Sequence, residues 1–225
     1  FRSYPFVTVH SNTADKFASA FNFSNVVIKQ GEVLTQQYPV NANNAYRRFQ
    51  LPSANVDTST LSVIVFESSS NSYSNEYSIA NDLTELTPES FVYFIEEDEN
   101  LYWTVYFGDG VLGVKPKDGN VVQISYVDTS GAIANNVSSF KFVDPVGGLY
   151  REDVRLTTRI ASRGGADKED IDSIRLRAPH FYTAQNRAVT TTDYESMLVT
   201  GYPNIDAVSV WGGRSEEHTS ELQSH

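Results

Sequence analysis

Short runs of β-branched and aromatic residues, divided by turn-forming residues, dominate the first 145 residues of the chain. Five of these runs predict strands, at residues 26–28, 61–66, 91–95, 103–107 and 121–127. Turn signals separate them at residues 29–31, 108–110 and 117–120. In the last run Val122, Ile124 and Tyr126 alternate with polar residues, as in a strand with one buried face. The polar stretch 68–78 is expected to be an exposed loop.

The pattern changes after residue 148. A predicted strand at 154–160 leads to a glycine pair, and a helix is then expected to begin at Asp167, a plausible N-cap. Three apolar residues follow at helical spacing, Ile171, Ile174 and Ala178. Pro179 is expected to end or kink this helix.

A second helix is predicted from a capping box in which Thr192 is the N-cap and Glu195 the third helical residue. Tyr194, Met197 and Leu198 would then share one face, and residues 205–211 would return as a strand. The predicted class is therefore α+β. A β-rich domain, sandwich-like or built of small sheets with hairpins, is expected at 1–148, and a small α/β region with two short helices and a strand at 149–213.

Residues 214–225 resemble a translated sequencing-library adapter and are expected to be non-native. They are polar, lack an apolar period and follow abruptly on the predicted final strand. On this interpretation the chain is a fragment, truncated at both ends, and its fold is to be understood without this tail.

Charge and composition narrow the expected partners. The formal net charge is −11, which argues against a nucleic-acid surface. A basic cluster at 151–177 is interleaved with acidic residues, which favours an exposed partner-facing surface over phosphate binding. Cysteine is absent, so disulfides and thiolate sites are excluded. No apolar run is long enough to span a bilayer, and we expect no membrane partner.

Groups that could carry chemistry are sparse. His10 is expected to be a surface or strand histidine, and His180 to pack or cap at a helix break. The acidic run Glu96-Glu97-Asp98-Glu99 is expected to be a solvated hairpin tip rather than a calcium site. Asp167 begins a superficially EF-hand-like stretch, but the positions that require Gly and Glu hold Asp172 and Ala178.

Phosphate-binding glycine motifs are also absent, and Gly108-Asp109-Gly110 is better suited to a tight hairpin leading into a strand at 111–114. A glycosidase site with two carboxylates across a cleft remains an alternative, because sequence cannot exclude that geometry. We therefore expect no enzyme activity, cofactor, metal or small-molecule substrate.

Two ordered sets of motifs resemble the baseplate wedge subunits of T-even-like contractile-tailed bacteriophages and their baseplate J-like relatives. One set comprises Gly164, Gly165, Asp167, Ala178, Pro179, Arg187, Val189, Thr190, Thr192, Asp193, Tyr194 and Glu195, followed by the predicted strand 205–211. The other comprises Gly108, Asp109 and Gly110 with the segments around residues 121–131 and 134–135. The resemblance covers roughly residues 100–213.

This resemblance implies a structural virion protein of the tail baseplate, assembled in the bacterial host cytoplasm. It implies a subunit that self-associates and docks other wedge subunits around the tail tube. The exposed faces of the predicted helices 167–178 and 193–200 are the expected contact surfaces. The alternative is a carbohydrate-binding or adhesin-like β-sandwich, suggested by Tyr73, Tyr77, Tyr93 and Tyr102.

Overall fold

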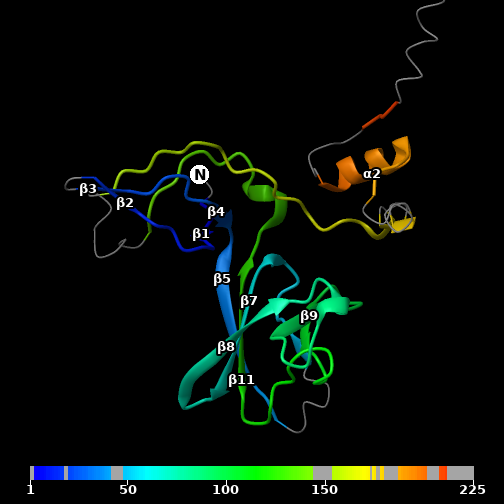
Figure 1. Cartoon of the computed structure of the whole chain (residues 1–225). Helices are drawn as coiled ribbons and strands as arrows, with labels where there is room; N and C mark the ends of the chain where they lie inside the picture. The colour runs from blue at the N-terminus through cyan, green and yellow to red at the C-terminus, as the bar shows by residue number, and fades with distance from the viewer. Residues whose placement is uncertain are drawn as a thin grey trace, which may run out of the picture. The chain divides into compact units, whose positions relative to one another are not determined.

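The arrangement of the strands was examined in a computed structural model (Figure 1). It describes residues 3–17, 20–41, 48–143, 154–172, 174–175, 178–179, 187–201 and 208–211. The chain divides into two units, Phe1–Ser130 and Gly131–His225, each of which is described by itself.

Strands make up most of the regular structure of the first unit. Their bounds are β1 (Phe6–Thr8), β2 (Asp15–Phe17), β3 (Ala20–Asn22), β4 (Ile28–Gln30), β5 (Glu32–Pro39), β6 (Arg48–Gln50), β7 (Val56–Ser68), β8 (Asn71–Ile79), β9 (Val92–Glu97), β10 (Trp103–Phe107) and β11 (Val121–Asp128). A 3-10 turn, η1 (Leu83–Glu85), lies between β8 and β9. Seven strands form one sheet in the order β5-β11-β7-β8-β9-β10-β6, and β1–β4 and β2–β3 are separate two-stranded ribbons.

The seven-stranded sheet contains one parallel pair of strands. Every neighbouring pair is antiparallel except β8 and β9, which run parallel and are paired only at Ser78 with Val92 and Ile79 with Tyr93. The β7–β8 pairing ends at Val63 and Tyr77. Beyond that point the first half of β7 and the β8–β9 junction separate, and a hollow lies between them.

The core forms on the face of β11 that the sequence alternation predicted. Val122 and Ile124 are fully buried and Tyr126 is 1% exposed, whereas the intervening Gln123 and Ser125 are less buried. On this opposite face, Ser125 and Gln123 bond across to β5 side chains. Burial of alternate apolar side chains thus fixes the register of β11 against its neighbours.

Aromatic rings within the core cluster join three further strands of the sheet. The Phe107 ring lies edge-on to Tyr77 at a centroid distance of 5.2 Å and to Phe49 at 6.0 Å. Such edge-to-face pairs are favoured by the ring quadrupoles. They connect β10, β8 and β6 through one cluster. Burial raises the pKa of the Tyr77 hydroxyl to about 12.

The predicted α+β class is wrong, because the described chain is mostly β. In the second unit α2 (Thr191–Gly201) is the α-helix whose bounds the described residues define, beside a 3-10 turn, η2 (Gly131–Ala134). Described residues within 171–179 are helical, but those between them lie outside the described set. The predicted helix start at Asp167 is wrong, because residues 167–170 are not helical. Residues 154–160 and 208–211 are not strands. Leu156 and Ile160 are 47% and 64% exposed, and a ladder partner for their segment is absent from the described chain.

In the first unit, four of the five expected strands are present, and the fifth, at 26–28, meets β4 only at Ile28. Strand 103–107 was predicted with its observed bounds, and those at 61–66, 91–95 and 121–127 lie within or overlap β7, β9 and β11. The expected loop 68–78 is wrong, since most of it is the hairpin strand β8. Residues 111–114 do not form the expected strand. Within the described residues, no helix has the length and apolar character needed to cross a bilayer.

Replacing Ile124 with alanine tests this account of the core. Ile124 is fully buried in β11, a strand paired on both edges, so Ile124→Ala should lower the free energy of unfolding by about 2–5 kcal/mol. Val33→Ala, on the adjacent edge strand and 53% exposed, should change it by less than about 0.5 kcal/mol. Chemical denaturation measures both values, and equal effects would contradict the assigned inner face.

Candidate functional site

Groups suited to nucleophilic catalysis are not brought together in the described chain. His10 is exposed just after β1, and His180 lies outside the described residues. The nearest arrangement to a nucleophile and base is Ser59 with Lys29. However, Lys29 Nζ forms an ion pair with Asp57 at 2.7 Å, and the Ser59 hydroxyl donates to the same carboxylate at 2.5 Å. Both groups are therefore engaged by Asp57.

The Asp57 carboxylate organises this cluster. Its partial burial acts to raise its pKa, but hydrogen bonds from Lys29 and Ser59 outweigh burial and hold the pKa below its usual value. The Ser59 amide adds a bond at 3.0 Å. This arrangement ties β4 to β7, which is a structural role for three polar side chains.

The acidic run at 96–99 lies at the β9–β10 hairpin tip. Asp98 Oδ1 accepts from the amides of Asn100 and Tyr102 at 2.9 and 2.8 Å, which closes the turn. Glu96 pairs with Arg48, whose guanidinium lies 4.5 Å from the centre of the Tyr106 ring. The described residues contain no group of three or more His, Asp or Glu placed to hold a metal ion.

The motif Gly108-Asp109-Gly110 forms a tight loop after β10. The Asp109 carboxylate accepts from the amides of Val111 and Leu112 at 2.9 and 3.2 Å, and these bonds lower its pKa. Gly110 has φ +97°, and a Cβ at Gly108 would lie 2.0 Å from the Leu112 carbonyl oxygen. Each motif residue therefore has a backbone-shaping role in the loop.

Two motif segments distant in sequence lie together in the second unit, at residues 131–137 and 162–167. The Asn135 side chain donates to the Gly165 carbonyl at 2.7 Å and accepts from the Gly165 amide at 3.0 Å. The Asn136 amide donates to the Ser162 carbonyl, and the Ser162 amide to the Val137 carbonyl, each at 2.8 Å. We call this paired arrangement the Asn135 clamp.

Glycine is required at the closest approach within the Asn135 clamp. A Cβ at Gly165 would lie 2.5 Å from the Gly131 carbonyl oxygen. Gly131 has φ +64°, and a Cβ there would lie 2.5 Å from the Asp167 carboxylate. Asp167 Oδ1 accepts from the Ala132 amide at 3.2 Å, so this predicted N-cap bonds to the turn η2. Gly164, with φ +84°, completes the sharp turn.

The capping box of α2 is displaced from its predicted position. The Thr190 amide donates to Asp193 Oδ2 at 2.8 Å, and the Asp193 amide donates to Thr190 Oγ1 at 3.2 Å. Thr190 and Asp193 therefore form the reciprocal pair, two residues earlier than expected for Thr192 and Glu195. Glu195 instead accepts from the Val210 amide at 2.8 Å, which joins the helix to residues 208–211.

The remaining motif residues lie at the surface of the described chain. Ala178, Pro179 and Arg187 are exposed, and Val189 is 81% exposed. On α2, Tyr194 is 49% and Met197 37% exposed, and Leu198 is half-buried. The predicted helix face is thus not closed into a core within the described chain.

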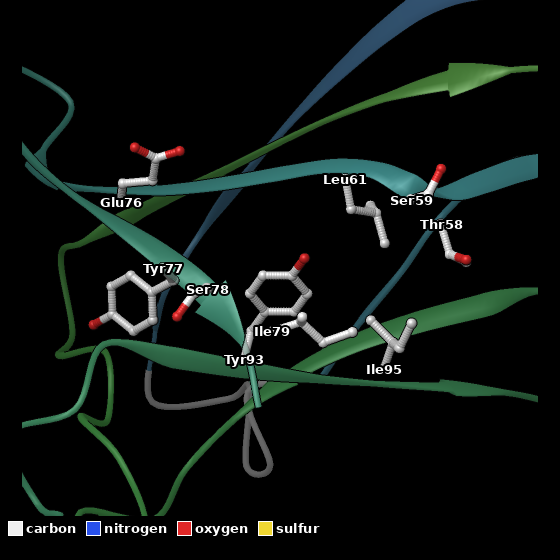
Figure 2. Close-up of a pocket in the computed structure, with 9 residues that line it drawn as sticks. All are labelled: Thr58, Ser59, Leu61, Glu76, Tyr77, Ser78, Ile79, Tyr93 and Ile95. Carbon is white, nitrogen blue, oxygen red and sulfur yellow. The ribbon is translucent and has the colours of Figure 1, made fainter. Parts of the chain in front are cut away.

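A hollow of about 630 Å³ lies where β7 separates from β8 and β9 (Figure 2). Its lining residues are Thr58, Ser59, Leu61, Glu76, Tyr77, Ser78, Ile79, Tyr93 and Ile95. Sequence reasoning missed this site, because its residues come from three strands that no local pattern brings together. The Tyr77 and Tyr93 rings are 5% and 4% exposed. These two rings are therefore not part of an open aromatic platform, whereas Tyr73, named for the same carbohydrate-binding alternative, is 64% exposed.

Asp98, Asp109, Asn135 and Asp193 thus each bond to backbone amides, whereas Asp57 and Glu96 pair with basic side chains. The chain is similar to the baseplate wedge protein gp6 of Enterobacteria phage T4, with 26% identity over 136 residues. The match covers 52% of this chain, and the chain spans about a fifth of the length of that relative (21%). No protein-family profile matches the sequence.

Removing the side-chain amide of Asn135 should weaken the Asn135 clamp. Asn135→Ala deletes two half-buried hydrogen bonds and should reduce local stability by about 1–2 kcal/mol. Hydrogen–deuterium exchange of the Gly165 amide, which donates to Asn135, should accelerate accordingly. Ser138→Ala, an exposed position in the neighbouring turn, is the control, and unchanged exchange in Asn135→Ala would contradict the assignment.

Substitutions at two neighbouring threonines test which residue caps α2. Thr190→Val removes the hydroxyl that accepts from the Asp193 amide, and should destabilise the first turn by about 1 kcal/mol. Thr191→Val, one residue further along, retains that bond. Amide exchange in residues 191–195 should increase only in the first variant. An effect confined to Thr191→Val would show that the helix begins elsewhere.

Proposed function

We propose that this chain is part of a structural subunit of a phage tail baseplate, a wedge-type protein of a contractile tail. The similarity to a baseplate wedge protein, extending over half of the chain, is the observation that supports this proposal most directly. The motif residues at 108–110, 131–137 and 162–167 add to it, because they fix backbone direction. An assembly component needs elements that point in fixed directions.

In this role the chain self-associates and binds other baseplate proteins around the tail tube, in a virion assembled in the host cytoplasm. Ring-forming interfaces bury large, partly apolar surfaces. The second unit exposes apolar side chains that suit such contacts, among them Tyr194, Met197 and Trp211. The chain has no catalytic role in this proposal, and its polar clusters serve to hold strands and turns.

The baseplate assignment is tested on purified phage particles that encode this chain. Mass spectrometry should detect peptides from residues 48–143 in whole particles and at higher abundance, relative to capsid protein, in isolated baseplates. Enrichment in capsid or tail-tube fractions instead would contradict the proposed location. Failure to find the peptides in particles that contain the other tail proteins would contradict the structural role.

Self-association through α2 is tested by a charge on its exposed face. Met197→Asp should weaken self-association at least roughly tenfold in sedimentation velocity, because a charge at an apolar contact loses burial energy and is desolvated. Val111→Asp, an exposed apolar position in the first unit, is the matched control. Equal behaviour of the two variants would place the self-contact on another surface.

A further inference from the structure

The hollow between β7 and the β8–β9 junction is a consequence of strand topology. β8 follows β7 as far as the Val63–Tyr77 pair and then runs beside β9, pairing through Ser78 and Ile79. The first half of β7 therefore has no strand on its β8 side in the described sheet. The view in Figure 2 shows the open space between these strands.

Residues 58–61 of β7 form an extended segment outside both ladders. β11 pairs with Asp57 and with Ser62, and the register shifts between these two pairs. On the β11 side the Thr60 hydroxyl accepts from the Val127 amide at 2.9 Å and donates to the Asp57 carbonyl at 2.7 Å. The segment facing the hollow is extended backbone that no described strand pairs with, although its Ser59 amide already donates to the Asp57 carboxylate. Unpaired strand edges of this kind are where strand addition occurs.

The lining of the hollow is mainly apolar but includes the hydroxyl of Tyr93. Leu61, Ile79 and Ile95 provide the apolar surface, and Ile79 is 38% exposed. The Tyr93 ring is 4% exposed, and its hydroxyl points into the gap in Figure 2 without a hydrogen-bond partner among the described residues. This hydroxyl is placed to donate a hydrogen bond to an acceptor of a bound segment.

Charge distinguishes the two ends of the hollow. At one end Ser59 adjoins the Lys29–Asp57 ion pair, where opposite charges are already balanced. At the other end Glu76 is exposed and has no ion-pair partner among the described residues. A ligand that carries positive charge at the Glu76 end would complement this distribution.

We infer that this hollow is a binding groove for an extended polypeptide segment of a second protein, which adds as a short strand beside residues 58–61. An aliphatic side chain of the segment packs among Leu61, Ile79 and Ile95. A main-chain carbonyl accepts from the Tyr93 hydroxyl, and a basic residue lies near Glu76. Identification of the second protein as another baseplate component rests on the proposed function, whereas the peptide chemistry rests on the groove alone.

The inference is tested by fluorescence anisotropy with a short synthetic peptide that alternates threonine and valine between terminal lysines. Saturable binding to the full chain is expected. Ile79→Asp should weaken it at least roughly tenfold, because the side chain that packs there loses its apolar contact. Tyr93→Phe, which keeps the ring, should weaken it about fivefold through the lost hydrogen bond. Circular dichroism and thermal melting establish that each variant is folded.

Matched controls separate strand addition from general stickiness. Val33→Asp, at an exposed valine on β5, should bind the peptide as the unaltered chain does. A peptide with prolines in place of its valines, which cannot complete a ladder, should not bind. Equal binding of both peptides, no saturable binding, or an unaffected Ile79→Asp variant would overturn the inference.

A second copy as the occupant is also tested. If Ile79→Asp abolished self-association in sedimentation velocity, the groove would be a contact between copies, and the inferred second protein would be wrong. The peptide assay needs no phage particle, so its failure leaves the baseplate assignment standing. Conversely, absence of the chain from baseplates would overturn that assignment without affecting measured peptide binding.

Discussion

The pairing of β11 with strands on both of its edges is the constraint on which the first unit depends. β5 matches it over eight residue pairs without a shift, and β7 matches it on the other edge with one irregularity. A slip of one residue would turn Val122 and Ile124 outward and bring Gln123 and Ser125 into the core. The apolar alternation of β11 therefore sets the register of three strands together, and the β7–β8 hairpin extends from that platform.

This same constraint produces the groove. Because β7 is held to β11 at both ends, residues 58–61 bulge where four residues of β7 lie opposite one of β11. β8 cannot follow that bulged stretch and pairs with β9 instead. The result is an unpaired segment of strand beside an apolar floor. Packing of the core thereby determines where a partner strand could be added.

The sequence predicted the strands of the first unit better than those of the second, and the reason is physical. Strands of the first unit were predicted from runs of β-branched and aromatic residues, and β10 was predicted with its bounds. β8 was missed because Asn71, Ser72, Ser74 and Asn75 resemble a loop, although pairing with β7 satisfies their backbone. Residues 154–160 resembled a strand, but a strand also needs a ladder partner, which a local pattern does not supply.

The α2 cap and the Asn135 clamp show the same limit at the scale of single side chains. The sequence contains two overlapping capping boxes, Thr190 with Asp193 and Thr192 with Glu195. Because Glu195 accepts from the Val210 amide, Thr190 and Asp193 form the reciprocal pair. The contact between Glu195 and Val210 joins residues that are distant in sequence, so a local pattern could not predict it. The Gly164-Gly165 pair indicated a turn, but its partner Asn135 appears only in the folded chain.

The distribution of apolar side chains completes the functional argument. In a chain with a closed core, apolar residues at helical spacing are expected to be buried, yet Ile171 and Ile174 are 57% and 42% exposed. On α2, the hydrogen bonds of the cap and of Glu195 hold the helix in place, while Tyr194 and Met197 remain exposed. Polar bonding thus fixes the backbone of α2 while these apolar side chains stay exposed, which is the distribution that the proposed subunit contacts require.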